Sequence, residues 1–407
     1  MIFCEHCFND REIASIICSV SASNVGECPV CHHREGHLYD TSTQSELTPY
    51  FEELLSIYTP STMLPDTYPK AETRSLIDDL KERWNIFSGI PRIHIYEILK
   101  SVCHELYVNV PEILDGTVGI PELYDNVYLQ SHALLKNNDW DAFVTEIKTK
   151  NRYHSKLIIF DILEKYCSFI RKTYKTGDLF YRARISEQTG YPISEMSAPP
   201  AGKSSEGRAN ARGITCLYVA SDVDTTLHEV RAGVFDFVSV GTFRLKQDIT
   251  VVDLRAITEI SPFVDGLEYL DHAINKQYLE KLNSEMSKSL RRSDSTLDYV
   301  PTQYIVDFIK SIEHNGTQEY DGIEYNSTTN PGGYNLAIFN PDLFECVSVS
   351  VYDIEKLQYT SKKVFESRGI ILKKNDSPAF FQSRLTDAVS VILSELLSYE
   401  HPSKPAG

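Results

Sequence analysis

Four cysteines near the N-terminus have the types and spacing of metal ligands. Cys4 and Cys7 form one C-x2-C pair, Cys28 and Cys31 form a second, and twenty residues separate the pairs. Each pair places two thiolates at one tight turn, and a tetrahedral Zn²⁺ ion is commonly bound between two such turns. Because four thiolates complete the coordination shell, we predict a structural zinc ribbon over residues 1–44. A redox pair, or thiols without a shared role, are the alternatives.

A second group of polar residues lies in the segment DGIEYNSTTNPGGYNLAIF, residues 321–339. Apolar runs at 322–325 and 334–339 predict two strands of a hairpin. The intervening Ser, Thr, Asn, Pro and Gly residues are those that turns favour for backbone reasons, so the loop by itself requires no further role. Ser327 and Asn335 become functional candidates only if polar residues from elsewhere face them.

Basic residues gather locally in an acidic chain. The net charge is −17, which argues against a nucleic-acid partner. Between residues 175 and 212, however, six basic residues stand against four acidic ones. The Gly- and Ser-rich stretch PPAGKSSEGRANARG in this region leaves backbone amides accessible, and amides together with arginines can hold a pyrophosphate. Each arginine alone is more often a surface charge, but Arg182 lies in the middle of a predicted strand. Neither G-x-G-x-x-G after a strand nor G-x4-G-K-[ST] occurs.

The predicted elements divide the chain into four parts. Residues 45–175 repeat apolar positions at helical spacing and predict a helical domain, a scaffold or recognition module, which we extend through LIIFDILEKYCSFIRKTY at 157–174. Residues 176–355 mix strands and helices in no repeating βαβ order, which favours an α+β domain. Residues 356–407 form a C-terminal extension with a helix. In the α+β part we expect strands at 179–185, 213–221, 237–245 and 249–255, a short helix after an Asp224 N-cap, and helices at 267–290 and from 301.

Five blocks of the chain, in this order, resemble the RES domain family: FYRAR, EGRANARGITCLYVAS, TTLHEVR, DYVPTQYIVDFIK and YDGIEYNSTTNPGGYNLAIF. The resemblance spans residues 178–350 and implies a fold akin to that of ADP-ribosylating toxins. It implies three catalytic residues, which are Arg182, Glu229 and Ser327, and three accompanying substrate-binding residues, which are Arg208, Tyr218 and Asn335. It further implies cleavage of NAD by hydrolysis or phosphorolysis, in a bacterial toxin or defence effector that has a neutralising or activating protein partner.

The chemistry of these residue types agrees with NAD cleavage. Breaking the nicotinamide–ribose bond produces an oxocarbenium-like ribosyl cation, which a carboxylate such as Glu229 stabilises. Arg182 and Arg208 would bind the phosphates, and Tyr218 would pack against nicotinamide. Ser327, supported by Asn335, would orient nicotinamide or its ribose. A solvated Glu229 paired with Arg231 is the simpler interpretation of that residue alone. An ADP-ribosyltransferase and a non-enzymatic zinc-ribbon adaptor are the rival functions.

The sequence also indicates where the protein acts. No apolar run approaches the length of a membrane span, and the N-terminus MIFCEHC has neither the basic nor the apolar segment of a signal peptide. We therefore expect a cytoplasmic protein without a membrane partner, and an oligomer is compatible with the sequence. Zn²⁺ is the expected structural cofactor and NAD the expected substrate.

Overall fold

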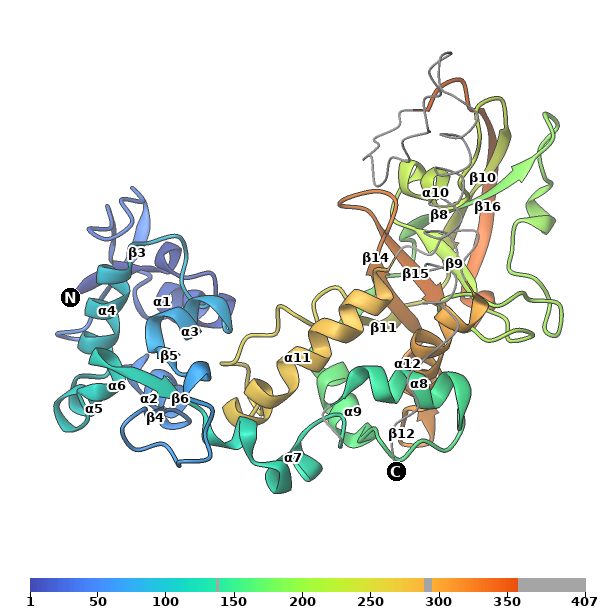
Figure 1. Ribbon diagram of the computed structural model, residues 1–407. Coiled ribbons are helices and arrows are strands. Elements are labelled where there is room, and N and C mark those ends of the chain that lie inside the picture. The colour runs from blue at the N-terminus through green and yellow to red at the C-terminus, as the bar shows by residue number, and fades with distance from the viewer. Residues whose placement is uncertain (137–138, 289–294, 358–407) are drawn as a thin grey trace, which may run out of the picture. The chain divides into compact units, whose positions relative to one another are not determined.

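The computed structural model describes residues 1–136, 139–288 and 295–357 (Figure 1). Met1–Lys356 form one compact unit. The helix predicted within residues 356–407 lies outside the described residues.

The N-terminal part combines a small sheet with short helices around one core. Its three-stranded sheet has the order β1-β3-β2, with antiparallel pairing. A second three-stranded sheet has the order β4-β6-β5. The elements are β1 (Ile2–Cys4), η1 (Glu5–Cys7), α1 (Arg11–Val20), β2 (Val25–Gly26), β3 (Gly36–Asp40), α2 (Thr48–Ser56), β4 (Thr59–Pro60), η2 (Lys70–Glu72), β5 (Arg74–Ser75), α3 (Leu76–Glu82), α4 (Arg92–Val102), α5 (His104–Asn109), α6 (Glu112–Asp115), β6 (Thr117–Gly119) and η3 (Pro121–Tyr124). One buried cluster takes in residues between Phe3 and Ile120, including Cys4, Cys7 and Cys28, and extends to Phe263, Tyr269 and Ala273.

Three further helices precede the large sheet: α7 (Asn126–His132), α8 (Trp140–Thr149) and α9 (Phe160–Phe169). Their apolar faces belong to the same buried cluster as residues of the strands and helices that follow, such as Val252 and Ile305. The helix predicted to continue to residue 174 is wrong at its end, because Arg171–Tyr174 form strand β7. Pairing with β11 stabilises the extended backbone there, and this long-range contact is invisible in the local periodicity.

The large sheet has eight strands in the order β16-β10-β8-β9-β15-β14-β11-β7. Its strands are β7, β8 (Leu179–Ser186), β9 (Leu217–Ala220), β10 (Phe237–Leu245), β11 (Ile249–Asp253), β14 (Gly322–Asn326), β15 (Tyr334–Ile338) and β16 (Phe344–Asp353). All neighbours are antiparallel except β11 and β14. The predicted hairpin at 321–339 is confirmed as β14 and β15, with Tyr325 opposite Asn335. Figure 1 shows these two strands beside β9.

The pairing between strands β8 and β9 in the large sheet is limited to one residue pair. β8 and β9 pair only at Tyr181 and Ala220. Two residues further along, where Ala183 and Tyr218 would be opposite each other in a continued antiparallel ladder, backbone groups take side-chain partners instead: the Ala183 amide donates to Thr226 Oγ1 at 2.9 Å, and the Tyr218 carbonyl accepts from Arg182 Nη1 at 2.9 Å. These bonds satisfy polar backbone groups that a continuous ladder would otherwise pair. The opening lets side chains from β8 and β9 line a common cavity.

The remaining elements are η4 (Ile193–Glu195), α10 (Val223–Glu229), α11 (Tyr269–Met286), η5 (Thr296–Tyr299), α12 (Val300–Ser311) and η6 (Pro341–Leu343). Two short strands, β12 (Glu313–His314) and β13 (Thr317–Gln318), form a separate hairpin. The N-cap predicted at Asp224 is wrong: Asp222 caps α10 by accepting from the Thr225 amide at 2.7 Å. Asp222 has the extended backbone that an N-cap requires, whereas Asp224 already lies within the helix. At the other end of α10, Glu229 is the last helical residue and is exposed.

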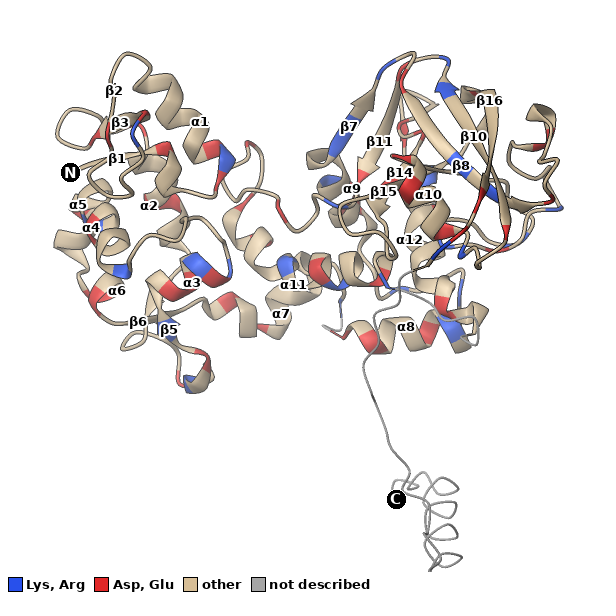
Figure 2. Cartoon of the chain, turned by 90° about the horizontal axis from the view of Figure 1, so that it is seen from above, with Lys and Arg blue, Asp and Glu red and all other residues tan. Residues whose placement is uncertain are grey.

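The α+β class is confirmed by this mixture of helices and strands. The domain boundaries at residues 44 and 175 stay a prediction, and buried clusters cross both of them. Among the described residues, no helix is long and apolar enough to cross a membrane. Lys and Arg residues are dispersed among Asp and Glu residues over most elements (Figure 2).

Candidate active site

The Glu229 carboxylate is held by the hairpin loop. Its Oε1 accepts from Ser327 Oγ at 2.7 Å, from Asn335 Nδ2 at 3.0 Å and from Thr329 Oγ1 at 3.3 Å. Hydrogen bonds from the described residues to this carboxylate all end on Oε1, so Oε2 is the oxygen left to meet a ligand. The carboxylate is thus fixed in place while one oxygen stays available.

Ser327 faces Glu229 through a tightly constrained hydroxyl. Its Oγ accepts from the amides of Asn330 at 3.1 Å and Thr329 at 3.3 Å, and it donates its proton to Glu229. The hydroxyl therefore uses its proton on the carboxylate and accepts from the loop amides. Asn335 on strand β15, which is only 4% exposed, donates a hydrogen bond to the same Glu229 oxygen.

Arg182 is a cation that no acidic side chain among the described residues neutralises. Its Nη1 donates to the Tyr218 carbonyl, its Nε is buried without a hydrogen-bond partner, and it forms no ion pair with the described residues. Burial, with Arg184 nearby, lowers the pKa of this guanidinium. A buried charge without a partner is costly, so the arrangement favours binding of an anion beside Arg182.

Arg208 and Tyr218 lie in the same region, but their polar groups form hydrogen bonds with other groups of the protein. Arg208 donates from Nη1 to the carbonyls of Glu285 and Met286 and from Nη2 to that of Lys288, at the C-terminal end of α11. A cation at this end of a helix is favourable because the last carbonyls lack helical partners. The Tyr218 hydroxyl donates to Asn210 Oδ1 at 2.6 Å and accepts from the Ala209 amide at 2.9 Å. Burial raises the pKa of the Tyr218 phenol, which stays protonated.

One cavity of about 550 Å³ brings these side chains together. Five of the six predicted residues line it: Arg182, Arg208, Tyr218, Glu229 and Asn335. Ser327 contacts it through Glu229, and its neighbour Thr328 is part of the wall. The volume is within the range of small-molecule sites.

The cavity has further walls that the sequence did not predict. They come from Thr226 on α10, Tyr325 on β14 and Tyr299 at the end of η5, and also from Gly207, Arg231, Ser295 and Thr296. Gly207 is required by packing, because a Cβ there would lie 2.6 Å from the Tyr218 hydroxyl. The TTLHEVR block contains both Thr226 and Arg231, so their closeness to Glu229 in the sequence was the one signal that could have identified them.

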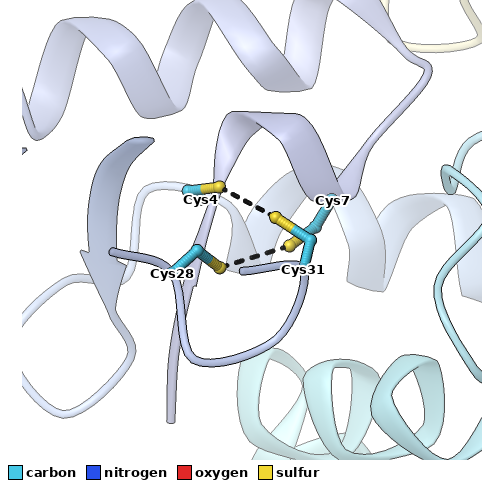
Figure 3. Close-up of side chains that lie close together, drawn as sticks. All are labelled: Cys4, Cys7, Cys28 and Cys31. Carbon is cyan, nitrogen blue, oxygen red and sulfur yellow. Dashed lines mark hydrogen bonds between the residues drawn. The ribbon is translucent and has the colours of Figure 1, made fainter. Parts of the chain in front are cut away.

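The four N-terminal cysteines converge as their spacing predicts (Figure 3). Sγ atoms lie 3.5 Å apart for Cys4 and Cys31 and 3.7 Å apart for Cys7 and Cys28. A disulfide requires about 2.0 Å, whereas a tetrahedron of thiolates around Zn²⁺ with bonds of about 2.3 Å has edges of about 3.8 Å. The Val30 amide donates to Cys28 Sγ at 3.4 Å, which helps to orient this thiol. The cluster is compatible with a zinc site.

Gly36 permits the close approach of the strand that follows the second cysteine pair. A Cβ at this position would lie 2.7 Å from Cys4 Cβ and 2.8 Å from Cys4 Sγ. Any larger residue would therefore displace Cys4, one of the four clustered cysteines. The three-stranded sheet holds this strand, β3, against Cys4.

The fold and cavity define an α+β enzyme-like domain in which a fixed carboxylate and an uncompensated arginine face one small-molecule cavity. Residues 179–360 match the family model of the RES domain, the family that the five sequence blocks resemble, and this match indicates an NAD-related, toxin-like enzyme family. No curated protein and no solved structure matched the chain. The relation to the fold of ADP-ribosylating toxins therefore stays a prediction.

Proposed function

We propose that the cavity binds NAD and that the protein cleaves the nicotinamide–ribose bond. The observation that carries this proposal is the pairing of two charges in one cavity: the Glu229 carboxylate, held at Oε1, and the buried guanidinium of Arg182, which has no ion pair among the described residues. NAD supplies both missing partners. Its pyrophosphate carries negative charge for Arg182, and its ribose becomes positively charged as the glycosidic bond breaks.

The bond between ribose C1′ and the nicotinamide nitrogen breaks with its electron pair going to the nitrogen. Nicotinamide leaves as a neutral molecule, and positive charge develops at C1′ and the ring oxygen. The Glu229 carboxylate stabilises this charge through Oε2. Water or phosphate then attacks C1′, and hydrolysis releases one proton to solvent. Stabilising charge that exists only in the transition state accelerates the bond-breaking step.

The other predicted residues have distinct roles in this proposal. Ser327 and Asn335 orient the carboxylate by donating to Oε1. Tyr218 forms a wall against which a planar ring can pack, and its carbonyl holds Arg182. Arg208 keeps α11 beside the cavity by capping its last carbonyls, and its charge adds to the electrostatic attraction for phosphate.

We propose that one Zn²⁺ ion is bound by Cys4, Cys7, Cys28 and Cys31. Four thiolates leave no open coordination position, so this ion would stabilise the N-terminal core and take no part in the reaction. The buried cysteines belong to the same cluster as the helices up to Ile120, which gives the ion a structural role beyond the first forty residues.

We further propose a role as a cytoplasmic toxin or defence effector that a protein partner neutralises or activates. Consumption of NAD deprives a cell of an essential redox cofactor, so an enzyme of this kind requires control. The family assignment supports this proposal.

The decisive experiment measures nicotinamide release from NAD by the purified protein, with and without phosphate. Release that does not depend on phosphate, together with formation of ADP-ribose, supports hydrolysis. Release that requires phosphate supports phosphorolysis. Transfer of labelled ADP-ribose to a macromolecule would instead favour a transferase, and an absence of release under every condition would refute NAD cleavage.

A further inference from the structure

The loop that carries Ser327 lies against the first turn of α10. Asn330 Nδ2 donates to Thr225 Oγ1 at 2.9 Å. Gly333 approaches the same side chain so closely that a Cβ at this position would lie 2.1 Å from Thr225 Oγ1. Thr225 is fully buried, with 0% of its surface exposed. The contact between loop and helix therefore depends on the size and polarity of one side chain.

Thr225 is in turn bound by the N-cap residue of α10. Its Oγ1 donates to Asp222 Oδ2 at 2.7 Å, and Ser221 Oγ donates to the same oxygen at 2.6 Å. Burial opposes ionisation of Asp222, but the hydrogen bonds from Ser221 and Thr225 outweigh it and lower the pKa of this carboxyl. An ionised carboxylate only accepts hydrogen bonds. The Thr225 hydroxyl must therefore donate to Asp222, and its lone pairs are left to accept from Asn330.

Helix and loop meet a second time at the other end of α10. Glu229 lies four residues, about one helical turn, after Thr225, and its Oε1 accepts from Ser327. The loop is thus attached near both ends of α10: Asn330 with Thr225, and Ser327 and Thr329 with Glu229. Because Glu229 is at the exposed end of the helix, the first attachment restricts how far Ser327 and the carboxylate can move.

We propose that Thr225 is a positioning residue for Glu229, acting through Asn330 and the loop that carries Ser327. The role in catalysis rests on the proposed cleavage of NAD. Without Oγ1, the Asn330 amide loses this acceptor, and of the hydrogen bonds described here between loop and helix those from Ser327 and Thr329 to Glu229 remain. The carboxylate then spends less time in the orientation that stabilises the ribosyl cation. We expect binding of NAD through Arg182 to be unaffected, because Arg182 forms no hydrogen bond with Asn330 or Thr225.

The test compares three variants with the full-length protein. Thr225→Val replaces the hydroxyl by a methyl group of similar size, and it keeps the backbone amide that Asp222 caps. Thr225→Ser keeps the hydroxyl and is the matched control. Gly333→Ala keeps Thr225 but forces the loop away from it. Amide hydrogen exchange of residues 327–334 reports the attachment directly, and kcat and KM for nicotinamide release report its consequence.

We expect exchange in this loop to be about tenfold faster in Thr225→Val and Gly333→Ala, with little change in Thr225→Ser. We expect kcat to fall about tenfold in the first two variants while KM changes by less than about threefold. Combining Thr225→Val with Ser327→Ala should lower kcat by less than the product of the two separate effects, since both act on one carboxylate.

Unchanged loop exchange in Thr225→Val would overturn the proposed attachment, whatever the activity. Faster exchange with unchanged kcat, or multiplicative effects in the double variant, would overturn the positioning role. A wild-type protein that releases no nicotinamide would count against the proposed function, and loop exchange would still decide whether Thr225 holds the loop.

Discussion

Replacing Glu229 by Gln removes the charge at the centre of the proposed reaction and keeps the shape of the side chain. The amide oxygen can still accept from Ser327 and Asn335 in place of Oε1, so the hairpin loop stays attached. The amide nitrogen then occupies the position of Oε2 and meets the developing ribosyl cation with a donor and no negative charge.

The expected loss follows from the electrostatic interaction between two unit charges. At a separation of about 4 Å this interaction amounts to ~1 kcal/mol in water and ~4 kcal/mol at an effective dielectric constant near 20. Glu229 is exposed in the free protein, but bound NAD would exclude water from the cavity. We therefore expect a loss of ~3 kcal/mol, which lowers kcat by about two orders of magnitude.

The assay measures nicotinamide release at saturating NAD, together with the melting temperature and the dissociation constant of NAD. The matched control is Asp224→Asn, which removes the same charge from the same helix at an exposed position outside the cavity. We expect Glu229→Gln to melt within a few degrees of the wild type and to bind NAD with similar affinity. A kcat close to that of the wild type would refute the assignment, as would an equal loss in Asp224→Asn.

Three further predictions concern other parts of the chain. Arg182→Ala should weaken NAD binding and lower kcat/KM together, because the phosphate charge is present in both substrate and transition state. An unchanged dissociation constant of NAD in calorimetry would show that Arg182 has only a structural role. Serine substitution of Cys28 and Cys31 should release one Zn²⁺ per chain. Because the cysteines share a core with the helices, protease sites should become exposed as far as about residue 120. Cleavage confined to residues 1–44 would instead show that the ribbon folds independently of the helices. A fragment that starts at residue 176 lacks β7, α8 and α9 and should show no cooperative melting, while a folded and active fragment would contradict the shared core.

Local patterns in the sequence correctly predicted several features of the fold. The doubled C-x2-C spacing was enough to predict the convergence of the four thiols, because each pair forms a turn by itself. Alternating apolar residues bounded by turn residues predicted the strands at 237–245 and the hairpin that carries Ser327. The order of the RES blocks identified five residues that line one cavity.

Features that depend on distant partners were decided only by the tertiary structure. The strand at 171–174 exists because β11 pairs with it, although its sequence continues a helical pattern. Arg208 has the chemistry of a phosphate ligand, yet its guanidinium caps carbonyls that lie about eighty residues further along the chain. The opening between β8 and β9 is equally invisible in the sequence, because a strand pattern gives no information about how far two strands pair.

The physical reason is that sequence patterns report the intrinsic preferences of neighbouring residues, such as turn formation, helical periodicity and alternation. Hydrogen bonds and packing between remote segments are decided when the chain folds, and they determine which polar groups are satisfied internally and which remain for a ligand. The amino-acid sequence therefore predicted that Arg182, Glu229 and Ser327 belong to one site. Only the tertiary structure decided that Ser327 donates to Glu229, while Arg182 is left with a charge that no described residue neutralises.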